Sequence, residues 1–246
     1  MAEERIAILG DVHANIDALN AVVEDARAEA VTTFHCVGDV VGYNANPQEC
    51  VDLIRSICTV VVRGNHDHYC SHDVSLSDFQ PNAAIAIEWT RKQINEESVK
   101  WLANLPMTKT FFQQSFSIVH ATLDMPEQWG YVFDAFDAAA HFTYQPTPLC
   151  FHGHTHCPMI YEKQMGAVYR IDAQDFTLHP GRKYFINVGS VGQPRDGDPR
   201  AAYLLYDPQE RKVRFRRVPY DIAAAQAKVR EAGLPERLAE RLSFGQ

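Results

Sequence analysis

The sequence lacks long apolar runs and lacks an excess of positive charge, and each absence excludes a class of protein. No apolar stretch approaches the roughly 18 residues that a membrane-spanning helix needs. The opening residues, MAEERIAILGD, have no hydrophobic region of the kind found in signal peptides. Basic residues number 23 and acidic residues 31, so the net charge is −8. We therefore expect neither a membrane protein nor a partner of long nucleic acids, although small nucleotides stay among the candidate ligands.

Paired cysteines of the CxxC type are also absent, which argues against a metal or redox motif of that kind. The six cysteines are scattered along the chain, at Cys36, Cys50, Cys58, Cys70, Cys150 and Cys157. Together with the N-terminus, they lead us to expect a cytoplasmic protein with reduced thiols. Repeats, low-complexity tracts and linkers are missing as well. We therefore expect one domain over residues 1–246, long enough to bury a substantial core without crosslinks.

What the first part of the sequence contains is an alternation of strand and helix patterns. Short apolar runs at 5–9, 32–37 and 59–63 predict strands. Helical spacing of apolar residues predicts helices at 16–29 and from Asn46-Pro47 to about residue 57. This order predicts an α/β fold that begins with a parallel sheet.

The remainder predicts a helical segment, then mostly strands. Residues 79–104 have a helical pattern in which Ile85 and Ile87 are expected to be buried. A strand pair is expected at 107–112 and 116–120, followed by a long loop with one short helix near 134–142. The remaining predicted strands are 149–152, 159–162, 167–171, 184–188, 202–206 and 213–218, with closing helices at 221–231 and 235–242.

Polar clusters follow the predicted strands at the points where they end. The first three are Gly10-Asp11-Val12-His13, Gly38-Asp39-Val40-Val41-Gly42 and Gly64-Asn65-His66-Asp67. His120 ends a later strand, and Gly153-His154-Thr155-His156 follows another. Ligands of open α/β sheets bind beyond the carboxyl ends of the strands, where neighbouring parallel strands bring such clusters together. One such string arises easily by chance, but five of them at strand ends do not suit a hydrophobic core.

The residue types in these clusters predict a metal centre. The pooled set is Asp11, His13, Asp39, Asn65, His66, His120, His154 and His156. This mixture of imidazole, carboxylate and amide oxygen suits Mn, Fe, Co, Ni or Zn better than Ca or Mg. Seven ligands with one shared carboxylate are enough for two divalent ions about 3.5–4 Å apart. Such a centre keeps net positive charge, so a phosphate ester is the expected substrate.

The motif series resembles that of the calcineurin-like metallophosphoesterase superfamily, which reads DxH, GDxxx, GNHD or GNHE, a lone His, and GHxH. It is complete and in order from Asp11 to His156. The segment from Asn187 to Arg195 is similar to the one that follows GHTH in small bacterial members.

The resemblance implies a four-layer αββα sandwich with two mixed β-sheets. It also implies hydrolysis of a small phosphomonoester or phosphodiester, nucleotide-like esters included, by a metal-bridging hydroxide. Roles follow position by position. Asp11, His13 and His156 would hold the first ion, and Asn65, His120 and His154 the second. Asp39 would bridge both ions, and His66 would donate a proton to the leaving group.

Two departures from the family bear on the substrate. The serine/threonine protein phosphatases carry Asp-Arg-Gly after the second motif, but here Gly42 is followed by Tyr43 and Asn44. The absent arginine disfavours a protein phosphatase. The stretch after His66 is also longer than in the smallest members, and residues at about 70–105 are expected to form a helical lid. A catalytically silent scaffold is the other alternative, disfavoured because no ligand is missing.

Several residues have two interpretations. Arg195 is either a clamp for a phosphate group or the partner of Asp196 or Asp198 in a salt bridge. Trp129, Tyr131 and Phe133 either stack on a nucleobase or lie in the core, and we favour the core.

Other residues near the motifs have simpler expected roles. His152 is expected in the core, or behind the ligands, although it alternates with them. Cys157 is expected to be a small buried residue rather than a ligand. The basic run at 211–217 is expected to be a half-buried strand rather than a groove for nucleic acid.

Overall fold

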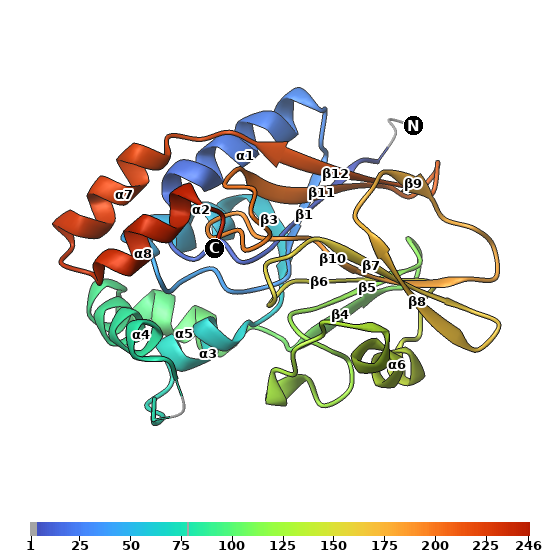
Figure 1. Ribbon diagram of the computed structural model, residues 1–246, viewed down its shortest axis with the longest axis horizontal. Coiled ribbons are helices and arrows are strands. Elements are labelled where there is room, and N and C mark those ends of the chain that lie inside the picture. Colours follow the sequence, from blue (N-terminus) through green and yellow to red (C-terminus); the bar gives the residue numbers. More distant parts are fainter. Residues whose placement is uncertain (1–3, 78) are drawn as a thin grey trace.

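Two six-stranded β-sheets face each other in the computed structural model, which describes residues 4–77 and 79–246. Helices cover the outer face of each sheet (Figure 1). The predicted four-layer αββα sandwich is therefore confirmed.

Sheet A contains the strands predicted in the first part of the chain. Its order is β3-β2-β1-β11-β12-β9, in which β1, β2 and β3 are parallel and the other pairs antiparallel. The bounds are β1 (Ile6–Leu9), β2 (Thr33–Cys36), β3 (Cys58–Val61), β9 (Phe176–Thr177), β11 (Ala201–Asp207) and β12 (Lys212–Val218).

Sheet B has the order β4-β5-β6-β10-β7-β8 and is also mixed, because β5, β6 and β10 are parallel and the others antiparallel. The bounds are β4 (Thr108–Phe111), β5 (Phe116–Val119), β6 (Leu149–His152), β7 (Met159–Gln164), β8 (Ala167–Asp172) and β10 (Lys183–Asn187). Each of these strands was predicted, whereas β9 was not.

The helices are mostly short. They are α1 (Ile16–Ala28), α2 (Pro47–Ile57), α3 (Asn65–Ser71), α4 (Pro81–Gln93), α5 (Glu96–Ala103), α6 (Ala135–Tyr144), α7 (Ile222–Glu231) and α8 (Glu236–Glu240), with 3-10 turns η1 (Pro126–Gln128) and η2 (Arg241–Ser243). None of those in the described part of the chain has the length and apolar character needed to cross a bilayer.

The core lies in three layers because the central strands are buried on both faces. In β1, Ile6 and Ile8 point between the two sheets, whereas Ala7 and Leu9 point toward the helices on sheet A. Side chains alternate along a strand, so one four-residue run supplies both layers. A third layer between sheet B and α6 contains Phe142 and Phe185.

The segment predicted as one helix over 79–104 is two helices. The chain turns after α4, and the Asn95 side chain accepts a hydrogen bond from the Ser98 backbone N–H at the start of α5. The prediction that Ile85 is buried was wrong, since it is 47% exposed, whereas Ile87 is buried. Helix α3, which begins within the GNHD motif, was not predicted.

The proposed lid segment is anchored in the fold over most of its length. Ile87 and Leu102 belong to the core beneath sheet A's helices, and Ala86 packs with Val229 and Leu238 of the C-terminal helices. Within the described part of this segment, Phe79, Gln80 and Ala83, at the start of α4, line the pocket beside the candidate site. That this part moves as a lid remains a prediction.

The basic run of β12 is neutralised within the fold. Arg214 pairs with Glu29 at 3.0 Å, and Arg216 pairs with Asp25 of α1 at 2.8 Å. Because these charges have partners, the interpretation as a half-buried strand fits better than a groove for nucleic acid.

Candidate metal centre

The eight pooled residues come together at the carboxyl-end edge of both sheets. They lie in the loops that follow β1, β2, β5 and β6 or, for Asn65 and His66, at the start of α3. All eight side chains are buried. Polar side chains are rarely buried without partners, so these eight side chains are expected to have hydrogen-bond partners or bound ions.

The loops that carry the cluster are strained. Five of the eight residues have a positive φ, namely Asp11, His13, Asp39, His154 and His156. A non-glycine residue in this region costs about 1–3 kcal/mol and persists where surrounding structure demands it. Here Asp11 N–H donates to the Gly38 carbonyl at 3.0 Å, and His13 N–H donates to the Asp39 carbonyl at 2.9 Å. These bonds hold the first two motif loops side by side.

Two motif glycines are needed because backbone passes directly against the carboxylates. A Cβ atom on Gly64 would lie 2.1 Å from Asp39 Oδ1, and one on Gly153 would lie 2.2 Å from Asp11 Oδ2. Any side chain at these positions would displace a carboxylate.

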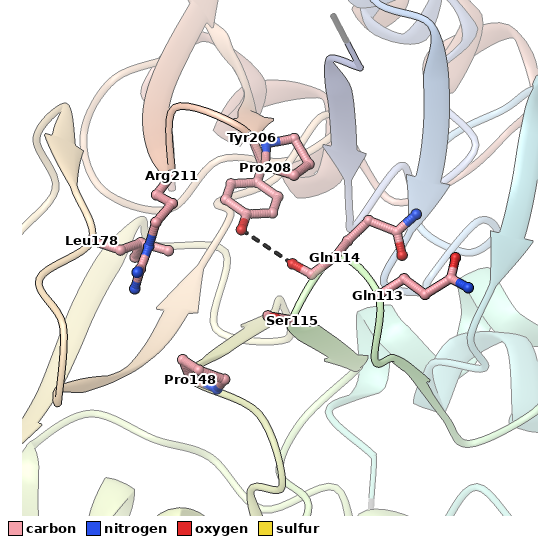
Figure 2. A pocket seen from close by; sticks show the side chains of 8 residues that line it. All are labelled: Gln113, Gln114, Ser115, Pro148, Leu178, Tyr206, Pro208 and Arg211. Carbon is pink, nitrogen blue, oxygen red and sulfur yellow. Dashed lines mark hydrogen bonds between the residues drawn. The ribbon is translucent and has the colours of Figure 1, made fainter. Parts of the chain in front are cut away.

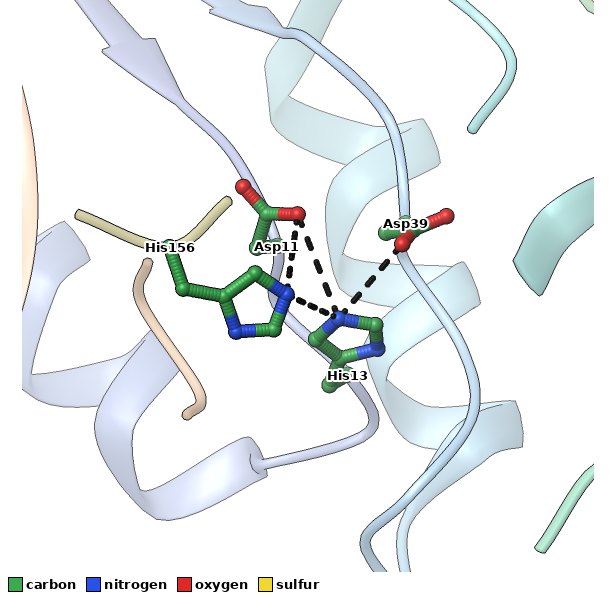
Figure 3. A group of neighbouring side chains, drawn as sticks. All are labelled: Asp11, His13, Asp39 and His156. Atoms are coloured by element: carbon green, nitrogen blue, oxygen red, sulfur yellow. Dashed lines mark hydrogen bonds and ion pairs between the residues drawn. The ribbon is translucent and has the colours of Figure 1, made fainter. Parts of the chain in front are cut away.

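The first group of converging atoms belongs to Asp11, His13, Asp39 and His156, as Figure 3 shows. The Nε2 atoms of His13 and His156 are 3.0 Å apart. His156 Nε2 lies 3.3 Å from Asp11 Oδ1, and His13 Nε2 lies 3.5 Å from Asp39 Oδ2.

The second group belongs to Asp39, His120 and His154. His120 Nε2 lies 3.4 Å from Asp39 Oδ2 and 3.2 Å from His154 Nδ1. Asn65 Oδ1 joins this group at 3.1 Å from His120 Nε2. The same oxygen of Asp39 therefore faces both groups.

Backbone carbonyls determine which nitrogen of each imidazole faces the cluster. In each of the four histidines, the ring nitrogen that points away from the cluster, here called the rear nitrogen, donates its N–H to a backbone carbonyl. The pairs are His13 Nδ1 to Val41 (3.0 Å), His156 Nδ1 to Gln193 (2.6 Å), His120 Nδ1 to Val37 (2.8 Å) and His154 Nε2 to Trp129 (2.9 Å). A carbonyl only accepts, so in each neutral ring the proton sits on the rear nitrogen and the front nitrogen presents a lone pair. Two lone pairs 3.0 Å apart repel unless a cation lies between them. The donor set therefore fits divalent metal, with the rear contacts typical of metal-binding histidines.

The electrostatics of the cluster point the same way. Burial and the nearby charge of Asp39 raise the pKa of Asp11 to about 7. Burial also opposes ionisation of Asp39, but the imidazoles of His120 and His66 hold its pKa well below the usual range. Burial lowers the pKa of His13 and His156 well below the usual range, so these rings favour the neutral form that binds metal. Burial lowers the pKa of His120, but the charges of Asp39 and Asp11 outweigh burial and raise that pKa to about 9. Cations would stabilise both carboxylates at once.

His66 lies beside the cluster but outside both groups. Its backbone N–H donates to Asp39 Oδ1 at 2.8 Å, and its ring centroid is 4.8 Å from that of His13. The Nδ1 atom is buried and has no hydrogen-bond partner among the described residues. Burial lowers the pKa of this ring to about 4.

Arg195 does not form the salt bridge considered as its alternative role. Asp196 pairs with Arg217, and Asp198 pairs with Arg200. Arg195 instead donates from Nη2 to Gln193 Oε1 at 2.9 Å, and its guanidinium carbon lies 5.5 Å from the centre of the Tyr43 ring. Its buried Nε has no partner within the described residues, so the salt-bridge interpretation was wrong.

Asp67 is a residue of the centre that the sequence analysis missed. It accepts hydrogen bonds from the backbone N–H groups of Asp39 (2.8 Å), Val40 (2.8 Å) and Gly64 (3.0 Å). These bonds hold the loop that presents Asp39. Its place as the last residue of the GNHD motif was the available sequence signal.

The aromatic residues before α6 do not lie in the core, so that interpretation was wrong. Tyr131 is 52% exposed and Phe133 61% exposed. Together with Trp129, Tyr131 lines a pocket of about 370 Å³ beside His66 and His154.

The other two residues near the ligands have ordinary structural places. His152 is in the core as expected, buried with its ring 3.8 Å from that of Phe185. Cys157 is partly exposed, so its expected burial was wrong.

A second pocket, of about 220 Å³, lies at the amino-end edge of the same strands (Figure 2). Tyr206 crosses it, and its hydroxyl donates to the Gln114 carbonyl at 3.2 Å. Its lining comprises Gln113, Gln114, Ser115, Pro148, Leu178, Tyr206, Pro208 and Arg211. Imidazole and carboxylate groups are absent from this lining, so it does not resemble a metal site.

Comparisons with known proteins agree with the geometry. The profile of the calcineurin-like phosphoesterase superfamily domain matches residues 5–211. An uncharacterized protein of Methanocaldococcus jannaschii is 39% identical over 248 residues, covering 100% of both chains. The crystal structure of a metallophosphoesterase from Sphaerobacter thermophilus is 42% identical, with a TM-score of 0.88 over 99% of this chain and 100% of that one. A hypothetical protein from Pyrococcus horikoshii shares the fold at 17% identity, with a TM-score of 0.77 and 98% of each chain covered.

Proposed function

Because the chain belongs to the calcineurin-like phosphoesterase superfamily, we propose that it hydrolyses a small phosphomonoester or phosphodiester at a centre of two divalent ions. Asp11, His13 and His156 hold the first ion. Asn65, His120 and His154 hold the second, and Asp39 bridges them.

One observation carries this proposal. The front nitrogens of four buried histidines converge in two groups, and a single oxygen of Asp39 faces both. When bound, the ions supply an activated water as nucleophile and positive charge that stabilises the phosphoryl group. Imidazole, carboxylate and amide oxygen together favour Mn, Fe, Co, Ni or Zn.

His66 is proposed to protonate the leaving oxygen. Its ring stands beside the first group without joining it, and its Nδ1 is free of partners within the described residues. Although burial lowers its pKa to about 4, an anionic ester beside the ring raises it and favours the protonated form.

Arg195 is proposed to bind a phosphate oxygen. Its guanidinium carries no ion pair among the described residues, and it lies over Tyr43, which in turn contacts His66 at 4.4 Å between ring centroids. A guanidinium in this position orients the substrate by its fork of N–H donors.

The alternatives are less well supported. A silent scaffold of the same fold would not need every ligand residue present and converging. A serine/threonine protein phosphatase would carry an arginine where Tyr43 and Asn44 stand.

Metal analysis followed by an ester panel tests the proposal. The purified protein is expected to hold two divalent ions per chain, to lose activity with a chelator and to regain it with Mn²⁺. A panel of p-nitrophenyl monoesters and diesters then separates phosphatase from phosphodiesterase. A fully loaded protein that cleaves none of them, or full activity with one ion per chain, would contradict it.

A further inference from the structure

The pocket beside the metal centre is lined largely by aromatic side chains. Besides Asn65, His66 and His154 of the centre, its lining contains Tyr43, Tyr69, Phe79, Trp129 and Tyr131, with Gln80 and Ala83. Its volume of about 370 Å³ falls within the range of pockets that hold small organic molecules, about 300–1,000 Å³. A phosphate group alone would leave most of this space unfilled.

Apart from Tyr43, which lies between β2 and α2, the aromatic rings come from two separate parts of the chain. Tyr69 of α3 and Phe79 before α4 contact each other edge to face, with centroids 4.5 Å apart. Trp129 and Tyr131 belong to the loop between η1 and α6. Among the described residues, no ring contact joins Tyr69 or Phe79 to Trp129 or Tyr131. The two groups of rings therefore line one pocket without packing on each other.

Rings of both groups contact histidine rings of the metal centre. Tyr131 stacks on His154 with centroids 4.1 Å apart and an interplanar angle of 26°. Phe79 meets His66 edge to face at 6.0 Å, and Trp129 lies at the same distance from His120. A molecule held between the rings would therefore place an attached phosphate at the converging ligands.

Tyr131 is exposed, and the other four aromatic rings of the pocket are half-buried, so their neighbours leave them incompletely covered. Tyr131 is 52% exposed even though Phe133 stacks parallel to it at 5.5 Å. Grouped exposed aromatic surface is uncommon on a protein and marks binding surfaces. The hydroxyls of Tyr43, Tyr69 and Tyr131 and the amide of Gln80 add hydrogen-bonding groups, which suit a polar heterocycle better than a hydrocarbon.

We propose that this pocket binds the nucleobase of a nucleotide ester whose phosphate lies at the metal centre. The proposal rests on the proposed phosphoesterase function and narrows its substrate class. A nucleobase is planar, stacks on aromatic rings and has polar edges. Arg195 contacts the Tyr43 ring but does not line the pocket, so it would contact the phosphate and not the base.

The test compares ligands that differ only in the base. Calorimetry on the Mn²⁺-loaded protein measures binding of AMP and of ribose 5-phosphate, and hydrolysis of both is followed by phosphate release. AMP is expected to bind about 5-fold or more tightly, since stacking contributes at least that factor per base. Equal affinity for the two ligands would overturn the nucleobase subsite.

Phe79→Leu removes an aromatic ring from the pocket. Of the proposed catalytic and metal-binding residues, the Phe79 ring contacts only His66 among the described ring contacts, edge to face with centroids 6.0 Å apart. The substitution is expected to weaken AMP binding about 5-fold while leaving ribose 5-phosphate binding and metal content unchanged. The matched control is Phe112→Leu, a 76% exposed ring in the turn between β4 and β5, which should change neither ligand. A second variant, Tyr131→Leu, tests the other group of rings, with metal content measured because this ring contacts His154.

The outcomes separate the two proposals. Base-dependent binding by a protein that hydrolyses no ester would support the subsite and contradict the phosphoesterase function. Hydrolysis of p-nitrophenyl esters with no preference for AMP, or equal losses for both ligands in Phe79→Leu, would contradict the subsite alone.

Discussion

The two ends of the same strands differ in what their loops do. At the carboxyl-end edge, positive-φ residues such as Asp11 and His156 are buried and point their ligand atoms at one another. At the amino-end edge, Ser115 and Arg211 also have positive φ, but they lie in the turns that border the pocket of Figure 2. Strained loops alone therefore do not make a site. What distinguishes the first edge is that buried imidazole nitrogens and carboxylate oxygens converge there.

Strand direction explains the difference. β1 runs parallel to β2, and β5 runs parallel to β6, so the loops after all four strands leave at one edge. The antiparallel pairs β4–β5 and β11–β12 are joined at the other edge by short turns, over residues 112–115 and 208–211. Short turns reverse the chain near the surface and bring few side chains together.

The largest effect is expected from a substitution at the carboxyl-end edge that removes the shared carboxylate of Asp39. Asp39→Ala should prevent the binding of two ions per chain and abolish ester hydrolysis, because one oxygen of Asp39 faces both ligand groups. Metal analysis of the purified variant and assays in excess Mn²⁺ provide the measurement. Two bound ions in this variant would show that Asp39 is not the bridge.

The next largest effect is expected from His66→Gln, and only for poor leaving groups. General acid assistance is worth about 10²–10⁴-fold, so alkyl phosphate esters should slow by that range. A nitrophenolate departs without a proton, so p-nitrophenyl esters should slow far less, with both ions still bound. Equal losses on both substrate types would instead favour a role in orienting the substrate.

Asp67→Asn tests whether the hydrogen bonds that hold the Asp39 loop are needed for metal binding. The amide cannot accept from all the backbone N–H groups that Asp67 binds, so metal affinity should fall by about 10–100-fold, the usual effect of losing a group that orients a ligand.

The amino-end edge offers a matched control for Asp67. Asp207 is also a buried carboxylate, and it accepts from the N–H groups of Gln209 and Glu210 at 3.1 and 3.0 Å. Asp207→Asn should lower the thermal midpoint without changing metal affinity, as measured by calorimetry. A similar loss of metal affinity in Asp67→Asn and Asp207→Asn would show that Asp67 has no specific role in supporting the metal centre.

Arg195→Ala is expected to have the smallest effect. Loss of a charged hydrogen bond to phosphate should weaken competitive inhibition by inorganic phosphate about 10-fold, with metal content unchanged. Arg211→Ala, which removes a guanidinium from the amino-end pocket, should leave inhibition as it was. Unchanged inhibition in Arg195→Ala would remove this residue from the proposed substrate contacts.

Much of the fold could be predicted from local patterns, and the failures have identifiable causes. Strands such as β1 and β6 are short apolar runs that end at a polar cluster, so their pattern is plain. Helix α3 was missed because its sequence, NHDHYCS, reads as a motif and has no apolar periodicity. The break between α4 and α5 depends on the Asn95 cap, and β9 has only two residues.

The sequence by itself determined the chemistry of this protein: the ligand types, their order, and their positions at strand ends. Only the tertiary structure decided which of them face one another. Periodicity cannot show that Val37, Val41, Gln193 and Trp129 offer carbonyls to four histidines, because these contacts join segments that are far apart in the chain. The same holds for Tyr131 and Phe133. Their apolar character suggested burial, but whether a ring is covered depends on how distant loops pack around it. Here the packing leaves both rings exposed, and Tyr131 lines the pocket beside the metal centre.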